Sequence, residues 1–328
     1  MEATRREALR ALLATGVVPL LATPVLADPL APGVGLPGPS TPSPVAPTPT
    51  ADGEDQAPGS VAGARSRFDH LTAPVTLNGS GPYPFIVDTG ASISCVSHDL
   101  VQSLGLPIRP GRRVHTIVGA KLQPMAVVDE LRIGVRRQRR MSALALKLVQ
   151  PGIGGVLAVD WLRGQRVTLD FAESRLAFEP SRAERSAPGV VVVPARRRHG
   201  QLTIVDADLG TRRISAMIDS GSQLSLCNSA LLALLDRRAT RPPERRRIEM
   251  VTIIGEPFSG ELVMLPFLRL GGLQMGDVPV VRSDSHVFEI WDLADKPTVL
   301  LGMDLLRQFR AVSLDFGRSQ VRFDLPRV

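Results

Sequence analysis

The sequence predicts an all-β protein, mainly strands with a few short helices, built from two copies of one folding unit. First, a short apolar run ends in Asp, a hydroxyl residue and Gly at two places about 130 residues apart. An apolar run of this length is typical of a buried strand. Second, several further segments recur in the same order after each run, and such ordered repetition indicates an internal duplication.

The two Asp motifs are the strongest pair in this repeat. Residues 85–92 contain Asp88, Thr89 and Gly90, and residues 216–223 contain Asp219, Ser220 and Gly221. Either triplet alone is an ordinary turn sequence. Two copies in matching surroundings instead indicate a pair of carboxylates, each held by a tight loop in a partly dry place.

The segments that follow each motif also match. A short helix is predicted after each one, capped by Ser97 and stopped by Gly105 in the first half, and capped by Asn228 in the second. Three later pairs of segments correspond in order: 131–134 with 268–271, 156–163 with 300–307, and 167–171 with 312–316. These matches extend the duplication over most of the chain.

Each half resembles a subunit of the retropepsin-like aspartic proteases. That family carries an Asp-Thr/Ser-Gly loop, a glycine-containing flap and a late apolar segment leading into a short helix, here 300–302. The resemblance covers roughly residues 67–326 and implies a two-lobed acid protease fold with a cleft between the duplicated lobes. One position departs from the family: Ala158 stands where Gly is usual, and its methyl is expected to crowd the loop beneath Asp88.

The resemblance implies that Asp88 and Asp219 form a catalytic pair. Two carboxyls held face to face share one proton, so that one activates a water while the other donates to the scissile carbonyl, as in aspartic proteases generally. This chemistry uses no metal and no cofactor. The supporting loop residues implied by the family are Thr89, Gly90, Ser220 and Gly221, and the recurring acids expected to be helix caps and turn formers are Asp160, Asp304, Asp170 and Asp315.

The residue after each Gly predicts which carboxyl holds the shared proton. Ser222 follows the second Gly, whereas Ala91 follows the first. A hydroxyl at this place is expected to hydrogen-bond an ionised carboxylate and lower its pKa. We therefore expect Asp219 to ionise more readily and Asp88 to carry the proton.

Two hairpins are candidate flaps. Their predicted substrate-binding residues are Ile117, Val118 and Gly119 in the first half, and Ile253, Ile254 and Gly255 in the second. By resemblance they close over an extended peptide; as plain surface hairpins they would not. An insertion at 283–296 has no counterpart in the first half, and it either lines one end of the cleft or forms a packed surface loop.

Composition excludes several classes of function. The net charge is +7, but the arginine runs sit between predicted strands and aromatic residues are not interleaved with them, which favours a solvated basic surface over a nucleic-acid site. The cysteines, Cys95 and Cys227, are expected in separate lobes and therefore unbridged. The five histidines are scattered, and no cluster has metal-ligand spacing.

The chain divides into five predicted parts. Residues 1–27, with Arg5-Arg6, an apolar stretch and Ala27, indicate a twin-arginine signal peptide and hence a periplasmic or secreted protein; the stretch is too short for a stable membrane span. Residues 28–65 form a Pro/Ala-rich disordered linker or a propeptide. The remaining parts are the first lobe at 66–180, a connection at 181–195 and the second lobe at 196–328.

The sequence thus predicts an exported aspartic endopeptidase that cleaves peptide or unfolded protein. It would act as a monomer whose halves form an intramolecular pseudo-dimer. An inactive retropepsin-like peptide-binding protein is the alternative, favoured only by Ala158. In a third arrangement, two chains pair through one repeat while the other repeat is a support.

Overall fold

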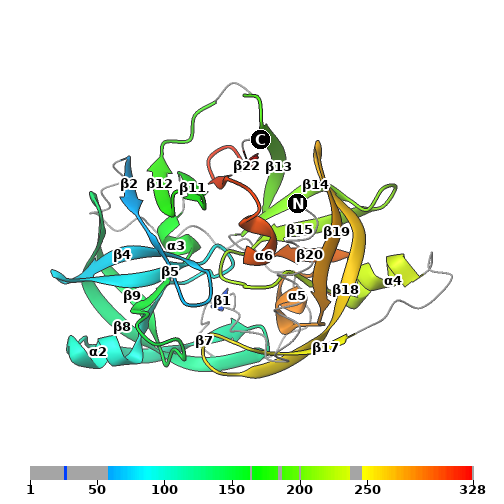
Figure 1. The fold of residues 1–328 in the computed structure, drawn as a ribbon. Coiled ribbons are helices and arrows are strands. Elements are labelled where there is room, and N and C mark those ends of the chain that lie inside the picture. Colours follow the sequence, from blue (N-terminus) through cyan, green and yellow to red (C-terminus); the bar gives the residue numbers. More distant parts are fainter. Residues whose placement is uncertain are drawn as a thin grey trace, which may run out of the picture.

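The computed structural model describes residues 26–27, 58–162, 165–183, 187–198, 201–236 and 246–326. It confirms the predicted all-β class: two lobes, each mainly of strands, lie side by side and are joined by strands drawn from both (Figure 1). The predicted leader lies outside the described residues except for Leu26 and Ala27, and most of the predicted linker lies outside them as well.

The first lobe is a mixed sheet that curls around its own core. Its described strands run in the order β1-β7-β8-β9-β6-β10-β5-β4-β3. Its helices are α2 (His98–Ser103) and α3 (Val159–Leu162). The strands are β1 (Leu26–Ala27), β3 (Ala64–Arg65), β4 (Leu71–Leu77), β5 (Ser80–Val87), β6 (Cys95–Ser97), β7 (Ile108–Thr116), β8 (Gly119–Ile133), β9 (Arg136–Leu146) and β10 (Gly155–Leu157).

The second lobe repeats this arrangement. Its helices are α4 (Ser229–Asp236), α5 (His286–Ile290) and α6 (Met303–Leu306), and α5 belongs to the insertion that the first lobe lacks. The strands are β13 (Val190–Arg198), β14 (Gln201–Asp208), β15 (Arg213–Ile218), β16 (Leu226–Cys227), β17 (Arg246–Val251), β18 (Pro257–Leu270), β19 (Leu273–Arg282) and β20 (Thr298–Leu301).

A shared sheet joins the lobes. It runs β2-β12-β11-β21-β22-β13 and then continues into the second lobe. At its centre β11 pairs antiparallel with β21, and the hydroxyls of Thr168 and Ser313 lie 2.9 Å apart. The two repeats therefore meet through equivalent strands. The remaining strands of this sheet are β2 (Gly59–Ala62), β11 (Arg166–Asp170), β12 (Arg175–Glu179), β21 (Ala311–Asp315) and β22 (Gln320–Asp324).

Two predicted boundaries differ from the structure. The end of the predicted linker forms β2 and β3, and the end of the predicted connection at 181–195 forms the start of β13. In both cases a sheet edge supplies the reason, because β2 pairs with β12 and β13 pairs with β22. An unpaired strand edge is stabilised by any segment that can add to it.

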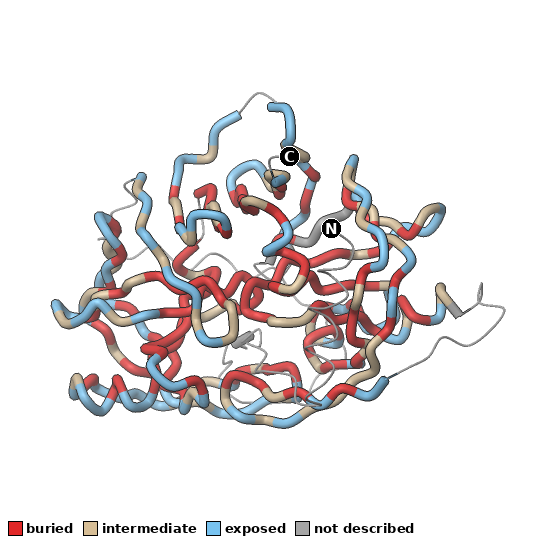
Figure 2. Tube along the Cα trace, viewed as in Figure 1, coloured by how far each residue is buried: buried red, intermediate tan, exposed pale blue. Residues whose placement is uncertain are grey.

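Buried residues run through the interior of both lobes (Figure 2), and most of them are apolar. A large cluster extends through the shared sheet, and two smaller clusters lie where the lobes face each other. The last residues of the strands that lead to the Asp motifs are buried. In the first lobe these are Phe85, Ile86 and Val87, which are 0% exposed. In the part of the chain that the structure describes, no helix is long and apolar enough to cross a membrane.

Candidate active site

Asp88 and Asp219 each follow a buried strand that a parallel partner holds in place. The backbone N–H of Asp88 donates to the carbonyl of Leu157 at 2.9 Å, and that of Asp219 donates to the carbonyl of Leu301 at 3.0 Å. Both side chains are 1% exposed. The β5–β10 and β15–β20 pairings therefore fix both carboxylates at the junction of the lobes.

The two Asp loops hold each other by reciprocal hydrogen bonds. The Thr89 hydroxyl donates to the carbonyl of Ile218 at 3.0 Å and accepts from the N–H of Ser220 at 3.0 Å. The Ser220 hydroxyl donates to the carbonyl of Val87 at 2.7 Å and accepts from the N–H of Thr89 at 3.1 Å. All four bonds cross between the lobes, so the position of one carboxylate depends on the other lobe.

The glycines of the two motifs allow this close approach. A Cβ added at Gly90 would overlap the carboxylate of Asp219, and one added at Gly221 would overlap the carboxylate of Asp88. Only a residue without a side chain fits at either place. The close approach of the two loops therefore explains why each motif carries glycine at this position.

The two carboxyls are buried together, and the pKa of each is raised. Burial raises the pKa of Asp88 to about 6, against hydrogen bonds from the N–H groups of Gly90 and Ala91 that lower it. Burial, followed by repulsion from ionised Asp88, raises the pKa of Asp219 well above its usual value. The larger rise at Asp219 favours a proton on Asp219 with Asp88 ionising first, the reverse of the assignment expected from the sequence.

Contrary to what the sequence had suggested, Ser222 does not hydrogen-bond Asp219 through its side chain. Its hydroxyl donates to the carbonyl of Leu224 at 2.8 Å, and only its backbone N–H reaches Asp219, at 3.1 Å from Oδ1. No donor among the described residues contacts Oδ2 of Asp219. That oxygen is the one on which a proton is most easily held, since nothing else stabilises its charge.

A second carboxylate in each lobe supports the Asp loop. Asp160 accepts from the hydroxyl of Ser94 at 2.6 Å, and the same hydroxyl accepts from the N–H of Ala158 at 3.0 Å. In the second lobe Asp304, Ser225 and Gly302 form the same contacts at 2.7 and 2.9 Å. The frame beneath Asp88 is therefore intact with Ala158 present, contrary to the crowding expected from the sequence.

The recurring acids are structural, with one correction. Asp170 and Asp315 accept from the N–H groups of Glu173 and Arg318 at 2.9 Å, as turn formers do. Asp160 and Asp304 are not helix caps: α3 begins at Val159 and α6 at Met303, so each Asp lies in the first turn of its helix. Burial raises the pKa of Asp304 to about 6, against the hydrogen bonds from Ser225.

The candidate flaps are hairpins that cross toward the opposite lobe. Ile117 and Val118 form the turn between β7 and β8, with Gly119 opening β8; Ile253, Ile254 and Gly255 form the turn between β17 and β18. Ile117 is 1% exposed in a cluster of second-lobe residues that includes Phe288 and Trp291. Ile253 is 3% exposed in a cluster of first-lobe residues, and its carbonyl accepts from the N–H of Val149 at 3.0 Å.

Glu256 joins the two flaps. Its carboxylate accepts from the hydroxyl of Thr116 at 3.0 Å and forms an ion pair with Lys121, both on the first flap. Its side chain is only 14% exposed. The sequence did not predict that these three residues contact each other, because 140 positions separate Thr116 from Glu256 and no pattern links them.

The other candidates have simpler outcomes. Cys95 and Cys227 are buried and unbridged, as expected. The histidines are less scattered than predicted, because the rings of His115 and His286 contact each other; His199 lies outside the described residues. His70 is buried, which lowers its pKa to about 4. Among the described residues, no group of three His, Cys, Asp or Glu could hold a metal ion.

Comparison with known proteins agrees with this geometry. A model of the aspartyl protease family matches the chain twice, at residues 73–161 and 205–305. Together these matches cover more than half of the 328 residues, and each contains one Asp motif. A search among curated proteins found no match.

Proposed function

The chain belongs to the aspartyl protease family, and on that premise we propose that it is an active endopeptidase with one catalytic dyad, Asp88 and Asp219. Peptides or unfolded proteins are the proposed substrates, and a monomer is the proposed active form. The observation that carries this proposal is that the two buried carboxyls face each other across reciprocally bonded loops, with the pKa of each raised.

The proposed mechanism uses the proton assignment described above. Ionised Asp88 removes a proton from a water lying between the carboxyls, and the water oxygen attacks the scissile carbonyl carbon. Protonated Asp219 donates to the carbonyl oxygen, giving a tetrahedral diol. Asp88 then returns its proton to the leaving nitrogen as the C–N bond breaks, and Asp219 recovers its own from the diol.

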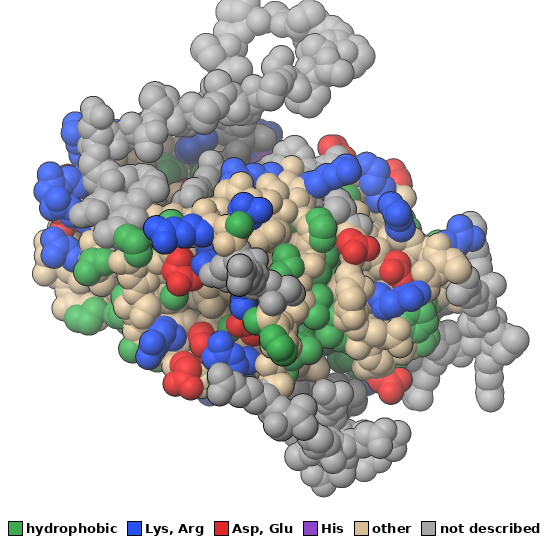
Figure 3. Space-filling view, turned by 90° about the horizontal axis from the view of Figure 1, so that it is seen from above, with side chains coloured by type: hydrophobic (Ala, Val, Ile, Leu, Met, Phe, Trp, Pro, Cys, Tyr) green, Lys and Arg blue, Asp and Glu red, His purple; other side chains and the backbone are tan. Residues whose placement is uncertain are grey.

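An extended substrate suits the two hairpins. Flap strands offer main-chain groups to a peptide in the manner of an added strand, and side-chain pockets then set the preference. The face seen in Figure 3 gives no support to a nucleic-acid partner, because basic and acidic side chains are interspersed on it rather than gathered into a basic stripe.

The hydrogen bonds around Ala158 support an active enzyme over the inactive alternative. Ala158 was the feature that favoured it, and the contacts around Ala158 match those around Gly302. The test is cleavage of an unfolded protein with and without a pepstatin-type inhibitor, using the Asp88→Asn, Asp219→Asn double variant as control. Inhibitable cleavage by the native chain is expected, and tight inhibitor binding without cleavage would instead identify a binding protein.

We also propose that the chain is exported by twin-arginine transport to the periplasm or beyond. The support is the sequence alone, through Arg5-Arg6 and the apolar stretch after it. Changing Arg5-Arg6 to Lys-Lys should retain the protein in the cytoplasm, because the receptor distinguishes guanidinium from ammonium groups. Normal export of that variant, measured by cell fractionation, would contradict the route.

A further inference from the structure

The two flaps have the same sequence pattern but differ in charge at one position. Residues 116–120 read Thr-Ile-Val-Gly-Ala, and residues 252–256 read Thr-Ile-Ile-Gly-Glu. The fifth residue is therefore Ala120 in the first flap and Glu256 in the second. A contact between the flaps that depends on this carboxylate is thus made from one side only.

Glu256 is held by both flaps. Within its own turn, its N–H donates to the hydroxyl of Thr252 at 3.0 Å, and its carbonyl accepts from the N–H of Thr252 at 2.8 Å. Toward the first flap, its carboxylate accepts from the hydroxyl of Thr116 at 3.0 Å and pairs with Lys121. Thr116 is 2% exposed, whereas the Lys121 side chain is 58% exposed. Because water weakens an exposed ion pair, the hydrogen bond to Thr116 provides most of the link. Glu256, Thr116 and Lys121 are called the clasp.

The hydroxyl of Thr116 has a second acceptor. The carbonyl of Gly119, in the same turn, lies 3.1 Å from it, and the carboxylate of Glu256 lies 3.0 Å from it. A hydroxyl has only one proton to donate, so it bonds fully to one of the two at a time. When the clasp breaks, this hydroxyl can donate to Gly119 while the carboxylate takes up water. The clasp can therefore open without leaving a buried donor unpaired, which would be costly.

Each flap inserts an isoleucine into the opposite lobe, close to the elements that carry the dyad. Ile117 lies in the apolar cluster that contains Met217, on the strand leading to the second Asp motif. Ile253 lies in the cluster that contains Ala91, in the first Asp loop. Both isoleucines are buried, as are the two Asp carboxyls. An extended substrate therefore reaches the carboxyls only after the flaps have moved.

One hydrogen bond accompanies each insertion and reports on one flap. The N–H of His286 donates to the carbonyl of Ile117 at 2.9 Å, and the N–H of Val149 donates to the carbonyl of Ile253 at 3.0 Å. His286 is the first residue of α5, and the first N–H groups of a helix have no acceptor within it. Exchange of the His286 and Val149 amides with solvent therefore measures opening of the first and the second flap separately.

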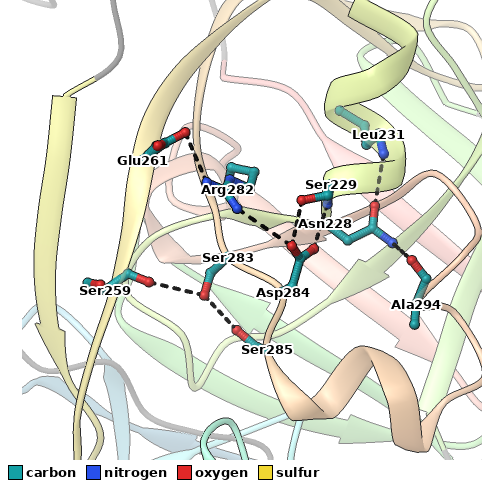
Figure 4. Close-up of polar contacts among 10 residues, drawn as sticks. All are labelled: Asn228, Ser229, Leu231, Ser259, Glu261, Arg282, Ser283, Asp284, Ser285 and Ala294. Carbon is teal, nitrogen blue, oxygen red and sulfur yellow. Dashed lines mark hydrogen bonds and ion pairs between the residues drawn. The ribbon is translucent and has the colours of Figure 1, made fainter.

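The surroundings of both flaps are anchored away from the clasp. The side-chain amide of Asn228 donates to the carbonyl of Ala294 at 3.2 Å and so holds the insertion that carries His286 (Figure 4). At the base of the second flap, the hydroxyl of Ser283 donates to the carbonyl of Ser259 on β18 at 3.3 Å (Figure 4). Opening is therefore expected at the ends of the hairpins, where the clasp lies, rather than at their bases.

We propose that Glu256 is a positioning residue that keeps both flaps closed, and that its contacts with Thr116 and Lys121 must break before either flap opens. The carboxylate is fixed in the second flap through Thr252 and bound to the first through Thr116, so neither flap can leave alone while the clasp holds. Substrate entry through this step rests on the proposed function, whereas the coupling of the flaps does not. Loss of one side chain should therefore loosen both flaps.

Hydrogen exchange at a single pH tests this proposal without relying on cleavage. Glu256→Ala gives the second flap the residue that the first flap has at the equivalent position. Protection of the His286 and Val149 amides should fall about tenfold in this variant, as expected for losing one hydrogen bond to a charged group. Glu256→Gln keeps an acceptor for Thr116 but removes the charge, so its effect on both amides should be smaller.

Two further variants test the source of the effect. Lys121→Met should lower protection of both amides about threefold, because its ion pair is exposed, and should add nothing to Glu256→Ala if both act through the clasp. Glu249→Ala is the matched control: it removes an exposed ion pair with Arg247 on β17, the strand that leads into the second flap. This control should leave both amides unchanged.

The possible outcomes are distinct. A fall at the Val149 amide alone would overturn the proposal, because Glu256 would then stabilise only its own flap. Unchanged protection at both amides would overturn it as well. An equal fall at the core amide of Asp88 would also overturn it, since Glu256 would then contribute only to general stability. The expected falls at both flaps in a chain that cleaves nothing would support the clasp and contradict only the proposed function.

Discussion

The two lobes share a hydrogen-bonded frame but differ in the packing around it. In each lobe a serine bridges a buried Asp and the backbone below the Asp loop, at distances that agree within 0.1 Å. The residue whose N–H meets that serine is Ala158 in one lobe and Gly302 in the other. Ala158 lies within a buried apolar cluster, whereas a Cβ at Gly302 would lie 2.6 Å from the Leu224 carbonyl oxygen. Equivalent positions thus tolerate different side chains.

The residue after each motif glycine is a second equivalent position at which the two lobes differ in side chain but share backbone contacts. Ala91 and Ser222 occupy equivalent positions, and each donates its backbone N–H to the nearby carboxylate, at 3.0 and 3.1 Å. The additional hydroxyl of Ser222 bonds within its own loop. The Ser222 side chain therefore does not distinguish the two carboxyls, which are equally buried and accept equivalent backbone hydrogen bonds.

The largest expected difference between the lobes is at Ala158 and Gly302. Gly302→Ala should destabilise the protein by about 3 kcal/mol or more, because the methyl must displace the backbone at Leu224. Ala158→Gly should cost about 1 kcal/mol, from a lost methyl and added backbone freedom. Urea unfolding of both variants measures the contrast. Equal losses would show that the two positions are packed alike.

Replacement of either dyad carboxyl should stabilise the fold at neutral pH. Both pKa values are raised in the native state, so the native protein binds more protons than the unfolded chain and loses stability as pH rises from about 4 through the native pKa. At pH 7, Asp88→Asn should raise the free energy of unfolding by on the order of 3 kcal/mol, and Asp219→Asn should raise it by at least as much. The gain should vanish near pH 3.5, where both states are protonated.

Urea unfolding at the two pH values provides the check. A gain that persists at pH 3.5 would indicate a packing effect of Asn rather than relief of a buried charge. A larger gain for Asp88→Asn than for Asp219→Asn would reverse the proton assignment.

The smallest expected effect is that of Ala91→Ser. The new hydroxyl should bond within its own loop as that of Ser222 does, so the acid limb of kcat/KM, set by Asp88 near pH 6, should move by less than about 0.3 pH units. A pH–rate profile of the variant measures this. A clear downward shift would restore the role first expected for a hydroxyl at this place.

Much of this arrangement could be predicted from the sequence. The all-β class, the duplication, the capping by Ser97 and Asn228 and the two Asp loops each depend on short local patterns, and the structure agrees with them. Such patterns are local because strands, caps and tight turns are specified by neighbouring residues.

Contacts between the lobes could not be predicted in the same way. The pairing of Glu256 with Thr116 and Lys121, and that of His115 with His286, join residues far apart in the chain that carry no shared pattern. The direction of the Ser222 hydroxyl depends on one rotamer, and the strands at the ends of the predicted linker and connection depend on open sheet edges. These features are decided by three-dimensional packing.

The central claim is that one chain builds one dyad with an Asp from each lobe. The most direct test is peptidase activity of Asp88→Asn and Asp219→Asn, each confirmed as folded and monomeric. The account predicts that both variants lose cleavage by at least about a thousandfold, since Asn supplies neither the base nor the shared proton, and that mixing them restores nothing. Near-normal activity in either variant would contradict the account, because the working pair would then be two copies of one Asp.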